Sequence, residues 1–233
     1  MLIFTDMQTT GVEADDLLCS IALLHEETLW YELVNEGKKI PPLASSLHNI
    51  TNEMIQEKEP FQKTQIYNFL QQNNNIEAVL IGHNVKFYGE KLAKSGLEWK
   101  GSVIDTKRVT KHLIPECELF SLQFLRYELK LYRQENRVKH KYGIKDAFCS
   151  HNALHDVLLT QILFEHLLEY ASVQEMKTLT FQNVLLEKFT FGKYMGKYIE
   201  EIVLNDQSYI RWMLNLEDLD EDLRYSLEYY LRG

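Results

Sequence analysis

The chain has 233 residues, of which 45% are hydrophobic and 25% are charged, and these are ordinary values for a globular protein. They exclude disorder and fibrous structure as the main state, and the length suits one domain with a small appendage. With 25 lysines and arginines against 34 aspartates and glutamates, the net charge is −9. Such an acidic chain does not coat nucleic acid nonspecifically, because that binding depends on many neutralised phosphates. Any nucleic-acid contact must therefore be local, metal-assisted or both.

The three cysteines, Cys19, Cys117 and Cys149, are widely spaced and form no CxxC pair. This pattern argues against a disulfide framework or a structural zinc site, and it favours a reducing compartment. The first residues lack the basic segment of a signal peptide, and the apolar stretches fall far short of the ~20 residues that cross a bilayer. We therefore expect a cytoplasmic chain without membrane contact.

The beginning of the chain predicts a strand followed by a hairpin. Residues 2–4 form a short apolar run that ends near Asp6, as a buried strand would. Residues 19–24 and 28–34 are two further strand-like runs, and the short gap between them indicates a hairpin.

The following segments alternate between helix and strand. Pro41 and Pro42 break regular structure, and Thr51 begins a helix. Apolar runs predict strands at 79–81 and 103–105, and helical spacing predicts helices at 60–70, 85–93, 106–113 and 152–170. A meander followed by alternating elements indicates an α/β fold with a mixed sheet flanked by helices. Asp6 and Asp105 end two strands, at the edge where such sheets usually place their sites.

A change of pattern near residue 171 indicates a second unit. An aromatic and basic segment with two glycines, residues 189–198, precedes acidic amphipathic helices. We therefore divide the chain into a domain over residues 1–172 and a small, mainly helical C-terminal module over residues 173–233.

That aromatic and basic segment has two interpretations. It is either a packing or interaction module, or a nucleic-acid contact in which Lys193 and Lys197 hold the backbone while Tyr194 and Tyr198 stack on bases. The surrounding acidic residues weaken the second interpretation.

Three short polar motifs can carry chemistry, although each has an ordinary structural explanation when taken alone. The motif D-M-Q-T-T-G starts at Asp6, G-H-N ends at Asn84, and H-N-A-L-H-D runs from His151 to Asp156. A strand-end carboxylate can hold a metal ion or cap a turn, and asparagine is a good helix N-cap. A histidine beside two carboxylates is a plausible arrangement of a base and a metal site.

In chain order these segments resemble the DEDDh family of 3′-to-5′ exonucleases, which includes the proofreading subunits of bacterial replicative polymerases. The family motif D-x-E-T-T-G reads D-M-Q-T-T-G here, H-N-x-x-F-D reads H-N-V-K-F-Y from His83 to Tyr88, and H-x-A-x-x-D is complete. Three further segments follow the family order: residues 40–54, the V-I-D-T sequence that ends at Thr106, and the S-L-Q-x-L sequence. The C-terminal segment resembles the small module of exodeoxyribonuclease X-like proteins.

The resemblance covers roughly the first 170 residues and implies a ribonuclease H-like fold that acts on single-stranded DNA or RNA 3′ ends. It implies magnesium or manganese ions between four carboxylates, with Asp6 bridging the ions, Asp156 holding one, and His151 deprotonating the attacking water. A DNA polymerase or another protein is an implied partner. The implied substrate-side or positioning residues are Thr9, Thr10, His83 and Asn84.

Two departures from the family pattern affect the metal site. Gln8 replaces the glutamate of the first motif, and Tyr88 replaces the aspartate of the second. Gln8 offers an amide oxygen without charge, and a neutral tyrosine is a poor magnesium ligand. With two of the four charges missing, two divalent ions should bind weakly or not at all. Acidic residues that would have to substitute are Glu13, Asp15, Asp16, Glu90 and Asp105.

Two functions therefore stay open. The chain is either an active exonuclease with weakened or rearranged metal binding, or a non-catalytic member that binds nucleic acid, a nucleotide or a protein. A cationic segment from Arg126 to Lys141 favours nucleic acid under either function, because its spacing places several cations on one helix face. The ordinary alternative for this segment is a solvated face.

Overall fold

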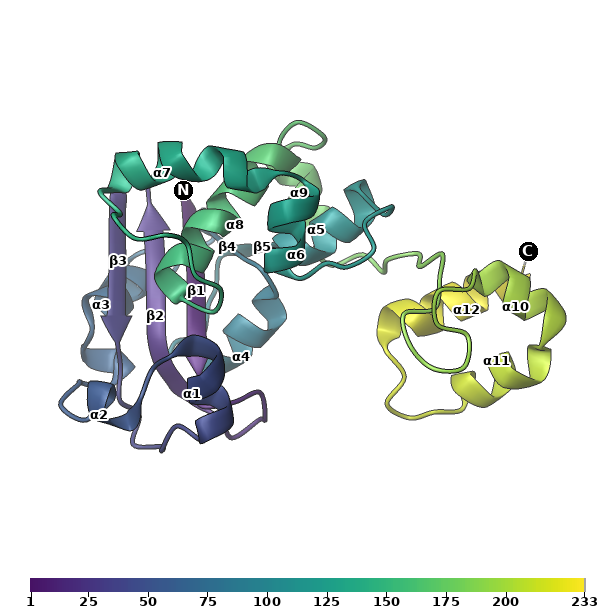
Figure 1. Ribbon diagram of the computed structural model, residues 1–233, viewed down its shortest axis with the longest axis horizontal. Coiled ribbons are helices and arrows are strands. Elements are labelled where there is room, and N and C mark those ends of the chain that lie inside the picture. Colours follow the sequence, from purple (N-terminus) through teal and green to yellow (C-terminus); the bar gives the residue numbers. More distant parts are fainter. Residues whose placement is uncertain (233) are drawn as a thin grey trace.

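The computed structural model describes residues 1–232 and contains a five-stranded sheet with helices on both faces and a small helical module to one side (Figure 1). The strands are β1 (Leu2–Thr9), β2 (Leu18–His25), β3 (Thr28–Leu33), β4 (Val79–Gly82) and β5 (Ser102–Asp105). The α-helices of the first unit are α1 (Pro42–His48), α2 (Asn52–Ile55), α3 (Gln65–Gln72), α4 (Val85–Lys94), α5 (Thr106–Leu113), α6 (Leu122–Glu128), α7 (Glu135–Tyr142), α8 (Ala153–Leu167) and α9 (Val173–Leu179). Two short 3₁₀ helices, η1 (Phe61–Lys63) and η2 (Leu131–Gln134), precede α3 and α7, and the module contains α10 (Ile199–Asn205), α11 (Gln207–Leu214) and α12 (Glu221–Arg232).

The sheet has the order β3-β2-β1-β4-β5, which confirms the predicted mixed sheet. The first three strands form an antiparallel meander, and β1, β4 and β5 are parallel. The strand predicted to end near Asp6 continues to Thr9, with a register shift between Gln8 and Thr9. The pairing of β4 with β1 ends at Phe4. Asp6 and Gln8 therefore lie beyond the end of β4, near the beginning of α4.

Two hydrophobic clusters cover the two faces of the sheet. One contains Phe4 together with the buried side of α8, and the other contains Ile3 and residues of α3 and α4. Side chains alternate between the faces of a strand, so Phe4, Asp6 and Gln8 share the face that α8 covers. This alternation brings the functional residues of β1 under the first turn of α8.

The helix α8 is buried on nearly all sides, because it packs on β1 and β2 and is covered by α5, α6 and α7. Its N-cap is Asn152, whose side chain accepts a hydrogen bond from the backbone of His155. This start, one residue from the predicted one, fixes Asp156 in the first turn. Within residues 1–232 no helix combines the length and the apolar character that crossing a membrane requires.

Two local expectations were wrong. Pro41 and Pro42 do not interrupt helical structure, because Pro42 occupies the first position of α1, where a missing N–H costs no hydrogen bond. The helix expected over residues 60–70 is divided into η1 and α3, because Thr64 ends the first and its side chain caps the second.

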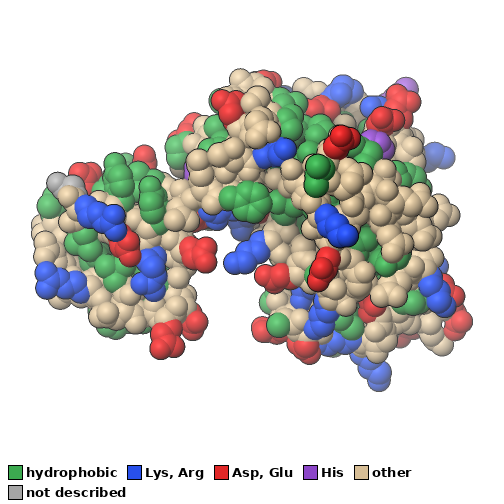
Figure 2. Space-filling model, turned by 180° about the vertical axis from the view of Figure 1, so that it is seen from behind, with side chains coloured by type: hydrophobic (Ala, Val, Ile, Leu, Met, Phe, Trp, Pro, Cys, Tyr) green, Lys and Arg blue, Asp and Glu red, His purple; other side chains and the backbone are tan. Residues whose placement is uncertain are grey.

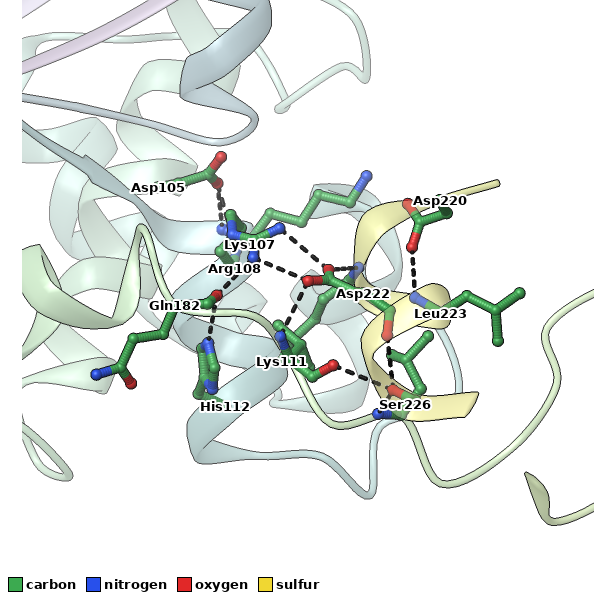
Figure 3. A network of polar contacts seen from close by, with 12 residues as sticks. Asp105, Lys107, Arg108, Lys111, His112, Gln182, Asp220, Asp222, Leu223 and Ser226 are labelled. Carbon is green, nitrogen blue, oxygen red and sulfur yellow. Dashed lines mark hydrogen bonds and ion pairs between the residues drawn. The ribbon is translucent and has the colours of Figure 1, made fainter. Parts of the chain in front are cut away.

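The boundary between the units also lies later than residue 173. The helix α9 contributes Met176 to the cluster around α8 and packs on β5 and α5, so it belongs to the first unit. The module has a separate core, formed by residues from Leu186 onward. The two units meet where Asp222, 1% exposed, accepts two hydrogen bonds from Arg108 and one from the backbone of Val184 (Figure 3).

Candidate functional site

Four of the residues singled out from sequence meet at one place. Asp6 and Gln8 come from β1, Tyr88 from α4 and Asp156 from α8. Both carboxylates are buried, with 4% of Asp6 and 6% of Asp156 exposed. The contact between the strand end, the start of α4 and the first turn of α8 therefore assembles the expected site from distant parts of the sequence.

Both carboxylate oxygens of Asp6 accept hydrogen bonds from neutral groups. The hydroxyl of Tyr88 donates to Oδ1, and the side-chain amide of Gln8 donates to Oδ2 at 3.1 Å. These are the two residues that occur where the family pattern has acids. The structure thus shows them filling the positions around Asp6 with hydrogen-bond donors.

Asp156 is held by a polar chain that the sequence did not predict. Gln123 in α6 donates from Nε2 to Oδ1 of Asp156 at 2.9 Å and accepts from Arg126 at 3.2 Å. Arg126 in turn makes a bidentate ion pair with Glu135, both side chains being largely buried. Gln123 and Arg126 are three residues apart on one helix, which is the sequence signal that they share a face.

Burial raises the proton affinity of both carboxyl groups, and the charge of Asp156 adds to this effect at Asp6. Burial raises the pKa of Asp156 to about 7, although the Gln123 hydrogen bond acts in the opposite direction. Burial, followed by the nearby charge of Asp156, holds the pKa of Asp6 well above its usual range. Burial and the neighbouring Asp6 also raise the pKa of Tyr88, so this hydroxyl is a donor at neutral pH.

Gly82 provides the space for the Tyr88 ring. A Cβ atom at Gly82 would lie 2.6 Å from Cε2 and 2.7 Å from Cδ2 of Tyr88, closer than real contacts allow. The ring is therefore seated directly against the backbone at the end of β4. This close fit orients the hydroxyl toward Asp6.

The exposed rim of the site carries the remaining candidates. His151 is exposed and has a left-handed backbone (φ 55°) before α8. The pKa of His48 is lowered, mainly because His48 is buried and in smaller part because of the charge of His151. Asn84 is exposed and occupies the N-cap of α4 without a side-chain capping bond. The hydroxyl of Thr9 donates to the carbonyl of Gly11 at 2.5 Å. The roles given to these residues as base and substrate contacts remain predictions.

Two candidates are engaged in the fold instead. His83 is 8% exposed, contacts the carbonyl of Phe120 and the hydroxyl of Thr106, and has a pKa that burial lowers to about 4. Thr10 donates to Asp16 at 2.8 Å and is 2% exposed. Neither side chain is free to contact a substrate at the surface.

The acids considered as substitutes lie elsewhere or are already bonded. Asp105 accepts hydrogen bonds from four backbone N–H groups, two at the start of α4 and two at the start of α5. Asp16 accepts from Thr10 and pairs with Lys38, which lowers its pKa to about 2 against the effect of burial. The others are exposed at the surface: Glu13, Asp15 and Glu90.

The residues present do not fit a two-ion centre. Residues 1–232 contain no group of three or more His, Cys, Asp or Glu side chains arranged to hold a metal ion. Two ions between carboxylates need several negative oxygens, whereas Asp6 and Asp156 are the two acids here and both oxygens of Asp6 are occupied.

The cationic segment from Arg126 to Lys141 is also partly neutralised. Besides the Arg126 pair, Arg137 pairs with Glu165 at 2.6 Å. The expected continuous cationic helix is divided between α6, η2 and α7, and Lys130, Arg133 and Arg137 of this segment line one pocket together with Glu165. Exposed cations in this segment include Lys130, Arg133 and Lys141.

Comparisons with known proteins find similarity to exodeoxyribonucleases. Residues 189–218 match the family model described as Exodeoxyribonuclease X-like C-terminal. The chain is 26% identical to exodeoxyribonuclease 10 of Escherichia coli K12 over 239 aligned residues, covering 100% of both proteins.

Solved structures show the same fold at low sequence identity. Exonuclease X in complex with 5′ overhanging duplex DNA has a TM-score of 0.59 and 22% identity, covering 77% of this chain and 99% of that chain. Escherichia coli exonuclease I in complex with a dA16 oligonucleotide has a TM-score of 0.51 and 17% identity, covering 76% of this chain and 42% of that one.

Proposed function

We propose that this chain, a DEDDh-type exonuclease-family protein with a ribonuclease H-like fold, binds single-stranded nucleic-acid 3′ ends and does not hydrolyse them. The binding site in this proposal is the surface around Asp6 and Asp156, with Asn84 and His151 at its exposed rim. The binding function is supported by the similarity to exodeoxyribonuclease 10 and by neighbours solved with DNA.

The observation that carries the loss of hydrolysis is the hydrogen bonding of Asp6. Metal-assisted hydrolysis requires cations held between carboxylates, which activate water and stabilise the leaving oxygen. Here the Tyr88 hydroxyl and the Gln8 amide occupy both oxygens of Asp6 without adding negative charge. The raised pKa of Asp156, about 7, gives this carboxyl a proton in a large fraction of molecules at neutral pH, which further reduces its affinity for cations.

A nuclease assay tests the first part of the proposal. A 5′-labelled single-stranded oligonucleotide is incubated with the wild-type chain and magnesium, then with manganese, beside Asp6→Ala. We expect intact substrate under all of these conditions. A ladder of shortened products that disappears in Asp6→Ala would refute the proposal and support an active exonuclease with a rearranged metal site.

Restoring the two acids tests the cause. In the double variant Gln8→Glu with Tyr88→Asp we expect manganese to raise the melting temperature and the oligonucleotide to be shortened. A ligand at a hundred times its Kd stabilises by ~2.7 kcal/mol, or roughly 5–10 °C for a chain of this size. The matched control adds the same charges at exposed positions, Gln71→Glu with Tyr132→Asp, and should respond to manganese as the wild type does.

Binding is measured separately from hydrolysis. Fluorescence anisotropy should show tighter binding of a linear oligonucleotide than of a circular one of the same length and sequence, because only the linear strand has a 3′ end. Equal affinity for the two strands would show that the site does not recognise an end, whatever the nuclease assay gives.

A further inference from the structure

The C-terminal module presents an aromatic and basic surface that packing does not require. Figure 2 shows hydrophobic side chains at the surface of this module with both basic and acidic side chains among them. We propose that the loop over residues 190–197 and the adjoining α11 form a second binding site for single-stranded nucleic acid, separate from the Asp6 site. We call this surface the module face and define it by Phe191, Lys193, Lys197, Arg211 and Trp212.

Part of the motif is explained by the fold of the module. Phe189 is 1% exposed in the module core, and its backbone pairs with Lys197 and Gly196 to close the loop. Gly192 has a φ of 75°, and a Cβ there would lie 3.0 Å from the hydroxyl of Tyr209. These residues fix the shape of the loop and hold it against α11.

Tyr194 also has a structural role, contrary to the expectation that it stacks on bases. It is half-buried, and its hydroxyl donates to Asp206 at 2.6 Å. Tyr198 is exposed but lies beside Lys188, with the ammonium 4.7 Å from the ring centre. The aromatic side chains of the module face are therefore different from those predicted, whereas the predicted Lys193 and Lys197 are part of it.

Phe191 and Trp212 are the aromatic residues of the module face that the core does not explain. They are 47% and 56% exposed, so neither rests in the hydrophobic core. Exposed aromatic rings of this size are typical of binding surfaces, and a nucleic-acid base stacks on any flat ring regardless of sequence.

A continuous row of side chains links the aromatic rings to a cation. The Lys193 ammonium lies 4.6 Å from the ring centre of Tyr194 and 5.8 Å from that of Tyr209. The ring of Tyr209 is 5.5 Å from Trp212. The exposed indole and the lysine are therefore both neighbours of one tyrosine, close enough to engage neighbouring parts of one strand.

The charge of the two segments favours a polyanion. Residues 190–197 and 207–214 contain Lys193, Lys197 and Arg211 but no aspartate or glutamate. The adjacent acid Asp206 makes an ion pair with Lys193 at 3.1 Å and accepts from Tyr194 and Ser208, so Lys197 and Arg211 supply the other two cations of these segments. Cations interleaved with exposed rings match the alternation of phosphates and bases in a single strand.

A circular single-stranded oligo-dT isolates the module face, because a circle has no 3′ end for the Asp6 site. The full chain is titrated while tryptophan fluorescence and anisotropy are recorded. Trp30 and Trp99 are partly buried in the first unit, so quenching by stacked bases should come from Trp212. We expect saturable quenching, about tenfold weaker binding in Trp212→Leu, and a log–log salt dependence that Lys197→Gln reduces by about 0.7.

The matched control is Tyr229→Leu, which removes an aromatic side chain 52% exposed on α12 of the same module. It should bind the circle as the wild type does, and circular dichroism checks that each variant is folded. Absence of circle binding by the wild type, or unchanged affinity in both Trp212→Leu and Phe191→Ala, would overturn this proposal. Neither result would affect end recognition, which the linear strand reports.

Discussion

The buried carboxyl of Asp156 makes a defined prediction about stability. Its pKa is about 7 in the folded chain and near 3.8 when exposed in the unfolded chain. Between these values the folded state holds a proton that the unfolded state releases, so the contribution of this group to stability is greatest below pH 3.8, falls as the pH rises from 3.8 to about 7, and is constant above that. The slope is about 1.4 kcal/mol per pH unit, which gives roughly 4 kcal/mol over the whole interval.

The neutral variant Asp156→Asn should remove this dependence while keeping the size of the side chain. Its Oδ1 atom can still accept the hydrogen bond that Gln123 gives to Asp156. Urea unfolding at half-unit steps from pH 5 to 8 measures the difference between wild type and variant. We expect the variant to gain on the wild type from pH 5 to about 7 and the difference to level off between pH 7 and 8, where the carboxyl is ionised in both states. A difference that stays constant from pH 5 to 8 would refute the raised pKa.

Three further predictions follow from the packing around the site and between the units. Gly82→Ala should destabilise the chain by about 1–3 kcal/mol because of the Tyr88 ring, and by less in a Tyr88→Asp background, as a double-mutant cycle in urea would show. Arg108→Ala removes the bidentate partner of buried Asp222 and should cost about 3 kcal/mol and increase protease cleavage near residues 181–188; unchanged cleavage would contradict the docking role. Gln123→Leu removes a hydrogen bond that lowers the pKa of Asp156, so the pH-dependent loss of stability should extend to higher pH. A stability-versus-pH profile identical to that of the wild type would show that this hydrogen bond does not affect the pKa of Asp156.

The sequence predicted the architecture well where patterns are local. Apolar runs located all five strands, and the run of residues 106–113 matched the observed α5. The meeting of Asp6 with Asp156 also followed from the resemblance, since motifs in chain order imply a shared site. Strand and helix periodicity depends on near neighbours along the chain, and for this reason it can be read without a structure.

The parts that sequence reasoning missed depend on distant partners. Arg126 appeared to belong to a solvent-facing cationic helix, whereas its charge is used by Glu135 in a largely buried pair. Asp105 appeared able to supply a metal ligand, but its oxygens cap the starts of two helices. In each case the residue type was noticed correctly, and only the fold shows which group it bonds.

The replacements at Gln8 and Tyr88 are connected by one physical requirement. Two carboxylates buried together without cations repel each other, and an unpaired buried charge is costly. Replacing the acids at positions 8 and 88 by residues that donate no hydrogen bond would leave the cost of the two buried carboxylates in place. Here Gln8 and Tyr88 donate to Asp6, and Gln123 donates to Asp156, so neutral hydrogen-bond donors stabilise the charges that cations would otherwise balance. Under the proposed function, metal binding at this site would therefore require the removal of donors as well as the addition of acids.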